Sequence, residues 1–230
     1  MEDLDAAKLD DVKEWFKTYY GPNNAVLAIA GDVNAQEILA KVKTYFGDIP
    51  PGPPIARFDQ WVAKRTGSSR QSAQDRVPQT RILKYWNVPG EATRERVLLN
   101  VAAQVLSSGK TSRLYKRLVY DEQTATRVVA YVDSREIASL FTLEVDVKKD
   151  GDPAKVERAM DEELAKLLAN GPTQDELDRA KTDVLSGFIR GVERIGGFGG
   201  KSDALAASMV YGGRPDAYKD ELEIVRTATP

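Results

Sequence analysis

The stretch Ser107–Val128, which reads SSGKTSRLYKRLVYDEQTATRV, decides how the rest of the chain is interpreted. Apolar residues at helical spacing before it predict a helix over residues 92–107, and a polar break follows around Gly109. A second apolar stripe predicts a helix over residues 111–121. The β-branched residues that come next predict a strand over Arg127–Asp133. This helix–glycine–helix–strand order indicates a module in which helices pack on a sheet.

The composition is that of a globular protein with a balanced charge. The 230 residues are 42% hydrophobic and 30% charged, and 33 Lys and Arg face 35 Asp and Glu. A net charge of −2 gives no reason to expect a nucleic acid or an anionic membrane as a partner. No apolar run approaches the roughly 20 residues of a membrane helix. We therefore expect no nucleic-acid partner and no membrane span.

The sequence contains neither Cys nor His. Disulfides, thiolate or imidazole zinc sites, and a histidine general acid or base are therefore impossible within this chain. A carboxylate site for Mg²⁺ or Ca²⁺ needs Asp and Glu at particular spacings, and no spacing here resembles one. We expect no catalytic residue, no metal site and no cofactor in this chain.

Residues 1–49 predict an α–β–α unit. Apolar residues at helical spacing over Leu9–Tyr20 predict its first helix. Ala25–Ala30, AVLAIA, is apolar on both faces and predicts a buried strand. Asn34 then caps a second helix, and the proline-rich residues 50–67 predict a linker.

The remaining residues, 68–230, predict a second αβ module. Strands are predicted over Arg70–Val77, Thr80–Val88, Arg127–Asp133 and Ala138–Val147. Further helices are predicted from Pro153 to Asn170, from a capping box at Thr173 and Glu176 onward, over Ala204–Tyr211 and over Tyr218–Val225. The predicted fold class is α+β, with a mixed, mainly antiparallel sheet packed against helices.

Two glycine-containing segments invite comparison with nucleotide-binding loops. Ser108–Thr111 resembles the end of a phosphate-binding loop, but that motif requires Gly where this chain has Gln104, and a preceding strand instead of a helix. Gly196–Gly200 is not preceded by a strand either, so we interpret it as a joint between helices. Two interpretations of the Gly109 loop remain. It is a turn that needs positive φ, or a loop that touches a substrate chain.

Four fragments, in order, resemble the pitrilysin/insulinase family of zinc metallopeptidases. They are Tyr19–Val33 (YYGPNNAVLAIAGDV), Tyr45–Pro50 (YFGDIP), Ser107–Val128, and Gly171–Lys181 (GPTQDELDRAK). The resemblance implies an αβ sandwich of the type found in LuxS and mitochondrial processing peptidase. It identifies residues 68–230 as a bacterial-type C-terminal module that lacks the family's His-x-x-Glu-His zinc motif. Residues 1–49 are then the α–β–α unit from the end of the preceding module. Zinc would then belong to another module of the full-length parent.

The resemblance also implies candidate contacts with substrate. The loop aligns with the glycine-rich loop of mitochondrial processing peptidase, which makes candidates of Ser107, Ser108, Gly109, Lys110, Ser112 and Arg113. The family holds substrate near zinc with an Arg and, seven residues later, a Tyr. Val119 and Thr126 stand at those positions here, so that pair is replaced.

The implied function is that of a non-catalytic domain, inactive alone, of a zinc metallopeptidase-like protein whose full-length form cleaves peptides. The alternative is a structural or assembly module of an inactive homologue. Other modules or a partner subunit of the same peptidase, and a peptide substrate, are the implied partners. The acidic first residues, MEDLDAAKLDD, do not form a signal peptide, but we expect a periplasmic parent.

A strand that is apolar on both faces needs partners in a sheet. We therefore predict that Ala25–Ala30 adds to the edge of a sheet built from residues 69–147. The pairing would occur within one chain or by exchange with a neighbour, which would give a domain-swapped homodimer.

Overall fold

The computed structural model describes residues 2–230, and these form two compact units. Unit 1 contains the residues up to Phe58 together with Gly191–Ala217. Unit 2 contains Asp59–Arg190 and Tyr218–Pro230. Residues 191–217 therefore belong to the same compact unit as the first part of the chain. The sequence analysis had assigned them to the second module, residues 68–230.

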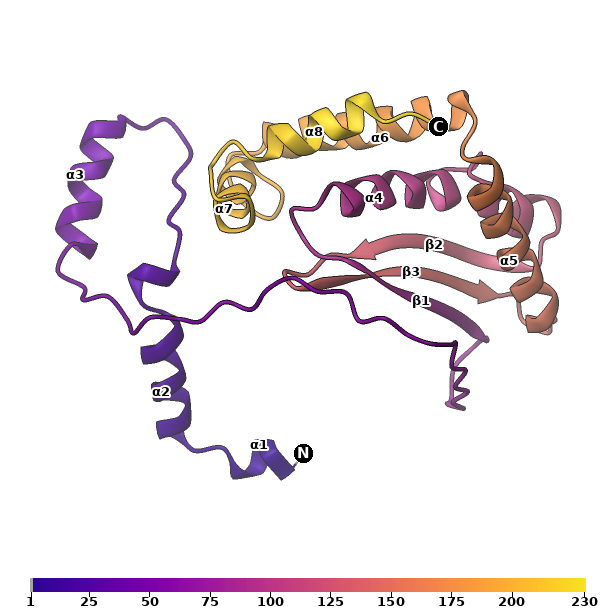
Figure 1. Ribbon diagram of the computed structural model, residues 1–230, viewed down its shortest axis with the longest axis horizontal. Helices are drawn as coiled ribbons and strands as arrows, with labels where there is room; N and C mark the ends of the chain where they lie inside the picture. Colours follow the sequence, from indigo (N-terminus) through magenta and orange to yellow (C-terminus); the bar gives the residue numbers. More distant parts are fainter. Residues whose placement is uncertain (1) are drawn as a thin grey trace. The chain divides into compact units, whose positions relative to one another are not determined.

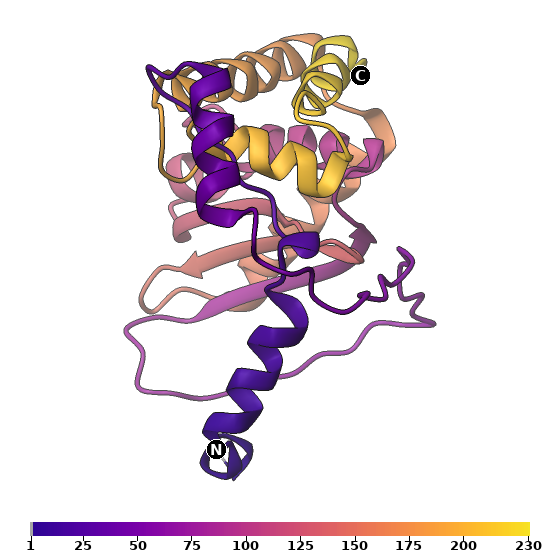
Figure 2. The same cartoon turned by 90° about the vertical axis from the view of Figure 1, so that its left-hand side faces the viewer.

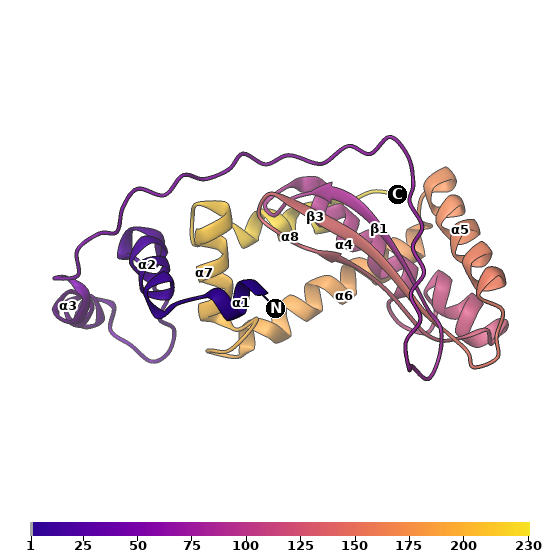
Figure 3. The same ribbon diagram turned by 90° about the horizontal axis from the view of Figure 1, so that it is seen from below.

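The sheet of unit 2 has three antiparallel strands. These are β1 (Arg81–Pro89), β2 (Ala125–Asp133) and β3 (Ala138–Val147), in the order β1-β3-β2 (Figure 1, Figure 3). The register places Trp86 opposite Phe141, and a bulge interrupts the β2–β3 pairing near Ala125. The predicted α+β class is confirmed.

Helices cover one face of this sheet in two layers (Figure 1, Figure 2). The layer next to the sheet contains α4 (Arg94–Ser107), the π-helix η2 (Tyr115–Asp121) and α5 (Pro153–Asn170). Above α4 lie α6 (Gln174–Glu193) and α8 (Tyr218–Thr227). Because α4 lies between the sheet and the outer helices, it buries side chains on two faces.

Two hydrophobic clusters fill the space between these layers. The first joins the sheet to α4, η2 and α5, and its fully buried side chains include Leu106, Leu114, Leu118, Leu143, Val145 and Met160. The second joins α4 to α6 and α8 through Val97, Val101, Val105, Leu177, Ala180 and Val225. The opposite face of the sheet carries exposed side chains, among them Leu83, Tyr85 and Tyr131.

The two predicted helix N-caps, at the starts of α5 and α6, are present in the structure. The Asp152 carboxylate accepts a hydrogen bond from the Ala154 N–H at 2.9 Å, one residue after the Pro153 that begins α5. At the start of α6, the Thr173 N–H donates to Glu176 Oε2 at 2.8 Å. The Glu176 N–H donates in return to Thr173 Oγ1 at 3.3 Å, which completes the reciprocal cap.

Two predicted strands are absent from the described sheet. Ala25–Ala30 is extended but joins no ladder within residues 2–230, so its predicted pairing with the sheet of the same chain is wrong. Arg70–Val77 forms no strand either. An alternating pattern identifies residues that suit a pleated surface, but a strand also needs a neighbour to accept its hydrogen bonds.

The helix predicted over residues 111–121 is wrong in type. Over Tyr115–Asp121 the backbone forms a π-helix, and the Glu122 N–H donates to the carbonyl of Arg117, five residues earlier, at 2.8 Å. Leu114 and Leu118 nevertheless both point into the first cluster, as the apolar spacing indicated.

Unit 1 consists of helices joined by extended chain. Its elements are α1 (Glu2–Ala6), α2 (Leu9–Tyr19), the short 3₁₀ helix η1 (Pro22–Asn24), α3 (Ala35–Phe46) and α7 (Lys201–Gly212). The Asn23 side chain ties η1 to the proline-rich segment, because Asn23 Oδ1 accepts from the Gly52 N–H at 2.7 Å. No residue from 2 to 58 is buried.

Candidate functional site

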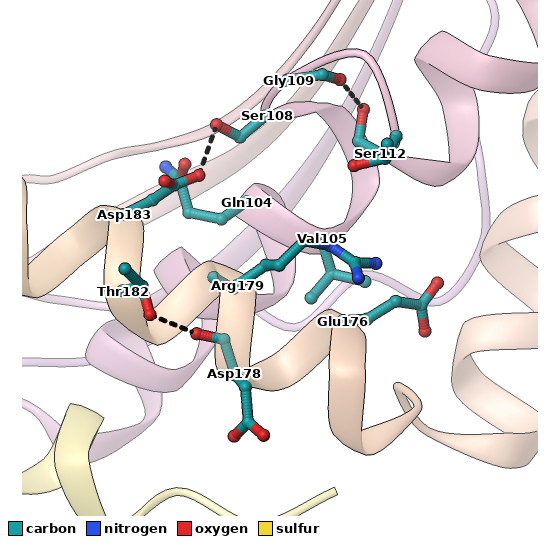
Figure 4. Close-up of a pocket in the computed structure, with 12 residues that line it drawn as sticks. Gln104, Val105, Ser108, Gly109, Ser112, Glu176, Asp178, Arg179, Thr182 and Asp183 are labelled. Carbon is teal, nitrogen blue, oxygen red and sulfur yellow. Dashed lines mark hydrogen bonds between the residues drawn. The ribbon is translucent and has the colours of Figure 1, made fainter.

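The candidate site is the loop between α4 and η2, which contains five of the six residues singled out in the sequence, and Ser107 is the last residue of α4. Figure 4 shows Ser108, Gly109 and Ser112 of this loop. Gly109, Lys110 and Thr111 are exposed, whereas Ser112 is buried. The loop is therefore at the surface at these three residues, and Ser107 and Ser108 are partly buried. Gly109 has φ of +75°, so the expected positive-φ turn is confirmed.

A groove of about 440 Å³ lies between this loop and α6. Most of its lining residues are of polar or charged type, and they comprise Gln104, Val105, Ser108, Gly109, Thr111, Ser112, Glu176, Asp178, Arg179, Ala180, Thr182 and Asp183. The Ser108 hydroxyl donates to Asp183 Oδ2 at 3.4 Å, and the Ser112 hydroxyl donates to the Gly109 carbonyl at 2.8 Å (Figure 4). A second hollow of about 710 Å³ shares Thr111 and Glu176 with the groove.

Arg113 and Glu176 form a bidentate ion pair beside the groove. Arg113 Nε donates to Glu176 Oε1 and Nη2 to Oε2, both at 2.7 Å, and Nη2 also donates to the Gly171 carbonyl at 3.0 Å. The Arg113 guanidinium lowers the pKa of Glu176 to about 2, against the opposing effect of burial. Thr173 adds to this lowering through its N–H and its hydroxyl. The pair thus fixes the loop to the start of α6.

Ser107 also has a structural role. Its hydroxyl oxygen accepts a hydrogen bond from the Ala130 N–H at 2.7 Å. Ala130 lies on β2, an outer strand of the sheet, so Ser107 satisfies a backbone donor that β3 does not.

The structure therefore divides the predicted contact residues into two groups. Ser107, Ser112 and Arg113 are engaged in bonds that hold the loop in place. Ser108 and Gly109 line the groove, and Lys110, which follows them, is exposed.

The two positions where the family's substrate-holding pair is replaced lie outside both hollows. Val119 packs against the first hydrophobic cluster. The Thr126 hydroxyl accepts from Gln79 Nε2 at 2.9 Å. Neither side chain supplies a cation or a phenol to the groove.

Sequence reasoning missed the contribution of α6. Glu176, Arg179 and Asp183 all line the groove, and they recur at three- and four-residue spacing on one face of that helix. That spacing is visible in the sequence, but only the fold brings it next to the Gly109 loop.

The arrangement offers hydrogen bonds and charges but no metal centre. Within residues 2–230, no group of three or more Asp, Glu, His or Cys side chains is placed to hold a metal ion. Because the chain also lacks His and Cys, its residues do not fit a peptidase zinc ion. In the same residues, no helix is long and apolar enough to cross a membrane.

Gly109 gives a direct test of the loop conformation. We expect Gly109→Val to lower the free energy of unfolding by about 1–3 kcal/mol, because a β-branched residue is strained at positive φ. No atom lies within 4 Å of a Cβ built there, so the cost comes from the backbone alone. Gly109→Asn should restore most of the loss, since Asn tolerates this conformation.

Gly187 is the matched control for that test. It lies within α6 with equally open space around it, so Gly187→Ala should stabilise the protein by about 0.5–1 kcal/mol. Equal effects of Gly→Ala at positions 109 and 187 in urea unfolding would contradict the assigned conformation of Gly109.

An antiparallel sheet layered with helices defines the class of protein: an αβ module. The family model described as the peptidase M16 inactive domain matches residues 6–184. The chain belongs to this family, and the resemblance to zinc metallopeptidases of the pitrilysin/insulinase type is confirmed.

Relatives and solved structures agree with this assignment. The zinc protease PqqE of Helicobacter pylori is 26% identical over 200 residues, which are 84% of this chain and 44% of that protein. The crystal structure of a protease from Helicobacter pylori superposes with a TM-score of 0.82 at 22% identity, covering 100% of this chain and 55% of that one. The structure of a peptidase M16 inactive domain from Pseudomonas fluorescens has a TM-score of 0.72 at 20% identity and covers 97% and 52%. The chain thus spans about half the length of the curated relatives it matches.

Proposed function

We propose that this non-catalytic module holds part of a peptide while a zinc-bearing module of the same protein cleaves it. The observation that carries the proposal is the Gly109 loop. Internal bonds of Ser107, Ser112 and Arg113 fix it, yet it leaves its tip exposed beside a polar groove. A fixed polar loop suits recognition, because little order is lost when a peptide binds.

The groove contains hydrogen-bonding groups that could bind the backbone of an extended peptide. Peptide backbones present alternating N–H donors and C=O acceptors. The Ser108 and Thr111 hydroxyls and the Gln104 amide can both donate and accept, and Arg179 supplies a cation near the loop. These groups bind and orient a chain but activate no water.

Zinc, where present in the complete protein, would supply the activated water for hydrolysis. The relatives are named zinc proteases, which supports zinc in another module. Nothing in this chain's own donor set fits that ion.

A first prediction concerns the isolated chain. We expect it to bind no zinc tightly and to cleave no peptide, because it has neither imidazole nor thiolate ligands. Metal analysis after dialysis and a peptidase assay with and without chelator measure both properties. Stoichiometric zinc, or activity that a chelator abolishes, would contradict this expectation.

The role of the loop is tested in the complete peptidase with the triple variant Ser108→Ala, Lys110→Ala and Thr111→Ala. We expect KM for a peptide substrate to rise about 10-fold with kcat nearly unchanged, because binding is lost equally in ground and transition states. Lys149→Ala, in the exposed turn after β3, is the control and should leave KM unchanged. An unchanged KM in the triple variant would refute the proposal.

One observation favours the second candidate function, a structural or assembly module of an inactive homologue. Val119 and Thr126 replace the pair with which the family holds substrate, and neither reaches the groove. Absence of chelator-sensitive peptidase activity in the complete protein would support this second function and contradict the first.

A further inference from the structure

We propose that a small hollow between α4, α6 and α8 is a binding site for an uncharged amide on a short aliphatic stem. The hollow lies within unit 2 and shares no lining residue with the groove beside the Gly109 loop. The inference therefore does not depend on the proposed function, and its test measures binding instead of proteolysis.

The hollow is small and mostly apolar. Its volume is about 110 Å³. Apolar side chains from all three helices form its wall, namely Val97, Val101, Val184, Phe188, Leu222 and Val225. Phe188 also stacks on Tyr218, with ring centroids 5.3 Å apart, so α6 and α8 hold each other beside the hollow. Since a water in the liquid occupies roughly 30 Å³, the hollow admits a ligand of only a few non-hydrogen atoms.

Arg96 supplies a polar group at the hollow. Its side chain is only 7% exposed, and Nη2 pairs with Glu91 Oε1 at 2.9 Å and with Glu221 Oε1 at 2.6 Å. Among residues 2–230, Arg96 Nε is the one buried side-chain nitrogen or oxygen without a hydrogen-bond partner. A buried N–H without an acceptor is costly, so this donor selects a ligand oxygen that accepts from it.

The charges around Arg96 favour an uncharged ligand. Two carboxylates, Glu91 and Glu221, already face the single guanidinium, so they would repel an anion. A cation would be attracted by Glu221, but an ammonium group has no lone pair with which to accept the Arg96 Nε–H. An uncharged oxygen acceptor meets both conditions.

Asn100 and Glu221 select an amide among the uncharged acceptors. Both line the hollow, and the Asn100 side chain can donate and accept, whereas the Glu221 carboxylate accepts. An amide presents an oxygen to Arg96 Nε–H and N–H donors to these acceptors, while its stem contacts the apolar wall. A few placed polar groups in an apolar hollow are typical of small-molecule sites.

A ligand-observed NMR titration of the complete protein with isobutyramide tests the site. We expect saturable binding with a dissociation constant in roughly the millimolar range, as for a ligand of so few atoms. Isobutyrate and isobutylamine share the branched stem but are charged, so each should bind at least roughly 10-fold more weakly. Binding that does not saturate, as when the hollow takes up only water, would overturn the proposal. So would equal affinities for the three compounds.

Two substitutions locate the bound amide. Arg96→Lys keeps a cation beside Glu91 and Glu221 but removes the Nε–H, so the affinity should fall at least roughly 10-fold. Val184→Phe keeps Arg96 and fills the hollow, so binding should be lost. Ile189→Phe, at an exposed position of α6 outside the hollow, is the matched control and should bind like wild type. Wild-type affinity in Val184→Phe would overturn the proposal, and that result does not require the Arg96 variant to fold.

The amide has two possible sources, a free small molecule or the side chain of a glutamine in a peptide. Competition between isobutyramide and the capped peptide Gly-Gln-Gly distinguishes them. Displacement of isobutyramide supports the site with a peptide side chain as its ligand, and saturable isobutyramide binding without displacement supports it with a free amide.

Discussion

Replacing Leu143 by alanine is expected to lower the free energy of unfolding by about 3–5 kcal/mol. Leu143 lies in the middle of β3, the central strand, and its side chain is 0% exposed within the first hydrophobic cluster. The change removes buried methyl groups and leaves a cavity, because close-packed neighbours relax only partly. Urea unfolding followed by far-ultraviolet circular dichroism measures the loss.

Leu168 provides the matched control for Leu143. It lies on α5 and is 78% exposed, so Leu168→Ala should change stability by no more than about 0.5 kcal/mol. If the two substitutions had the same effect, the assignment of Leu143 to the core would be wrong.

The second large effect is expected at the Arg113–Glu176 pair. Glu176→Ala should cost about 2–4 kcal/mol, because it leaves the Arg113 guanidinium, only 14% exposed, without its carboxylate. It also removes the reciprocal cap of α6. Glu176→Gln keeps a cap of the same shape and should cost less, so the two variants separate the charge from the cap.

The same carboxylate predicts how stability changes with pH. Its pKa in the folded protein is about 2, below the value of about 4.3 for an unfolded chain. The contribution is therefore complete above the unfolded pKa and is lost as the pH falls from about 5 towards 2. On the order of 2–3 kcal/mol of stability should depend on Glu176 over this window.

The measurement is the difference between wild type and Glu176→Gln across that pH window. Other carboxylates titrate in the same direction, since Arg117 lowers the pKa of Glu122 and Arg70 lowers that of Glu157. Glu223→Gln is the control, because Glu223 forms a similar bidentate pair with Arg226 in which both side chains are exposed. Identical pH curves for wild type and Glu176→Gln would contradict the assigned role.

Sequence patterns predicted the parts of the fold that depend on local chemistry. The strand expected over Ala138–Val147 has those bounds in the structure, because its strict alternation matches the two-residue period of a pleated strand. The caps at Asp152 and Thr173 also followed from neighbouring residues alone.

Predictions failed where the outcome depends on distant parts of the chain. Ala25–Ala30 and Arg70–Val77 have strand-like patterns, but neither pairs with a strand of the described chain. Residues 115–121 have a helical stripe, and the sequence carried no signal for the wider π turn.

The candidate site was predicted in part for the same reason. The Gly109 loop could be found because glycine and serine between two helical stripes indicate a turn. Its partner could not, since Arg113 and Glu176 are 63 residues apart and only the packing of α6 brings them together. Arg113 was thus expected to contact substrate, whereas the structure assigns it an internal bond.

The position of α4 in both hydrophobic clusters bears on the order in which the chain folds. The first cluster joins segments that follow one another closely, from β1 through α5, so modest loop closures bring them together. The second requires Val225, near the other end of the unit's sequence, to reach Val97 and Val101. Forming a contact between residues so far apart in sequence costs the chain more conformational entropy than forming a local contact. We therefore expect the sheet layer to form first and α8 to dock last. Until α8 docks, the face of α4 that receives it is exposed, and we expect association between incompletely folded chains to involve that apolar face.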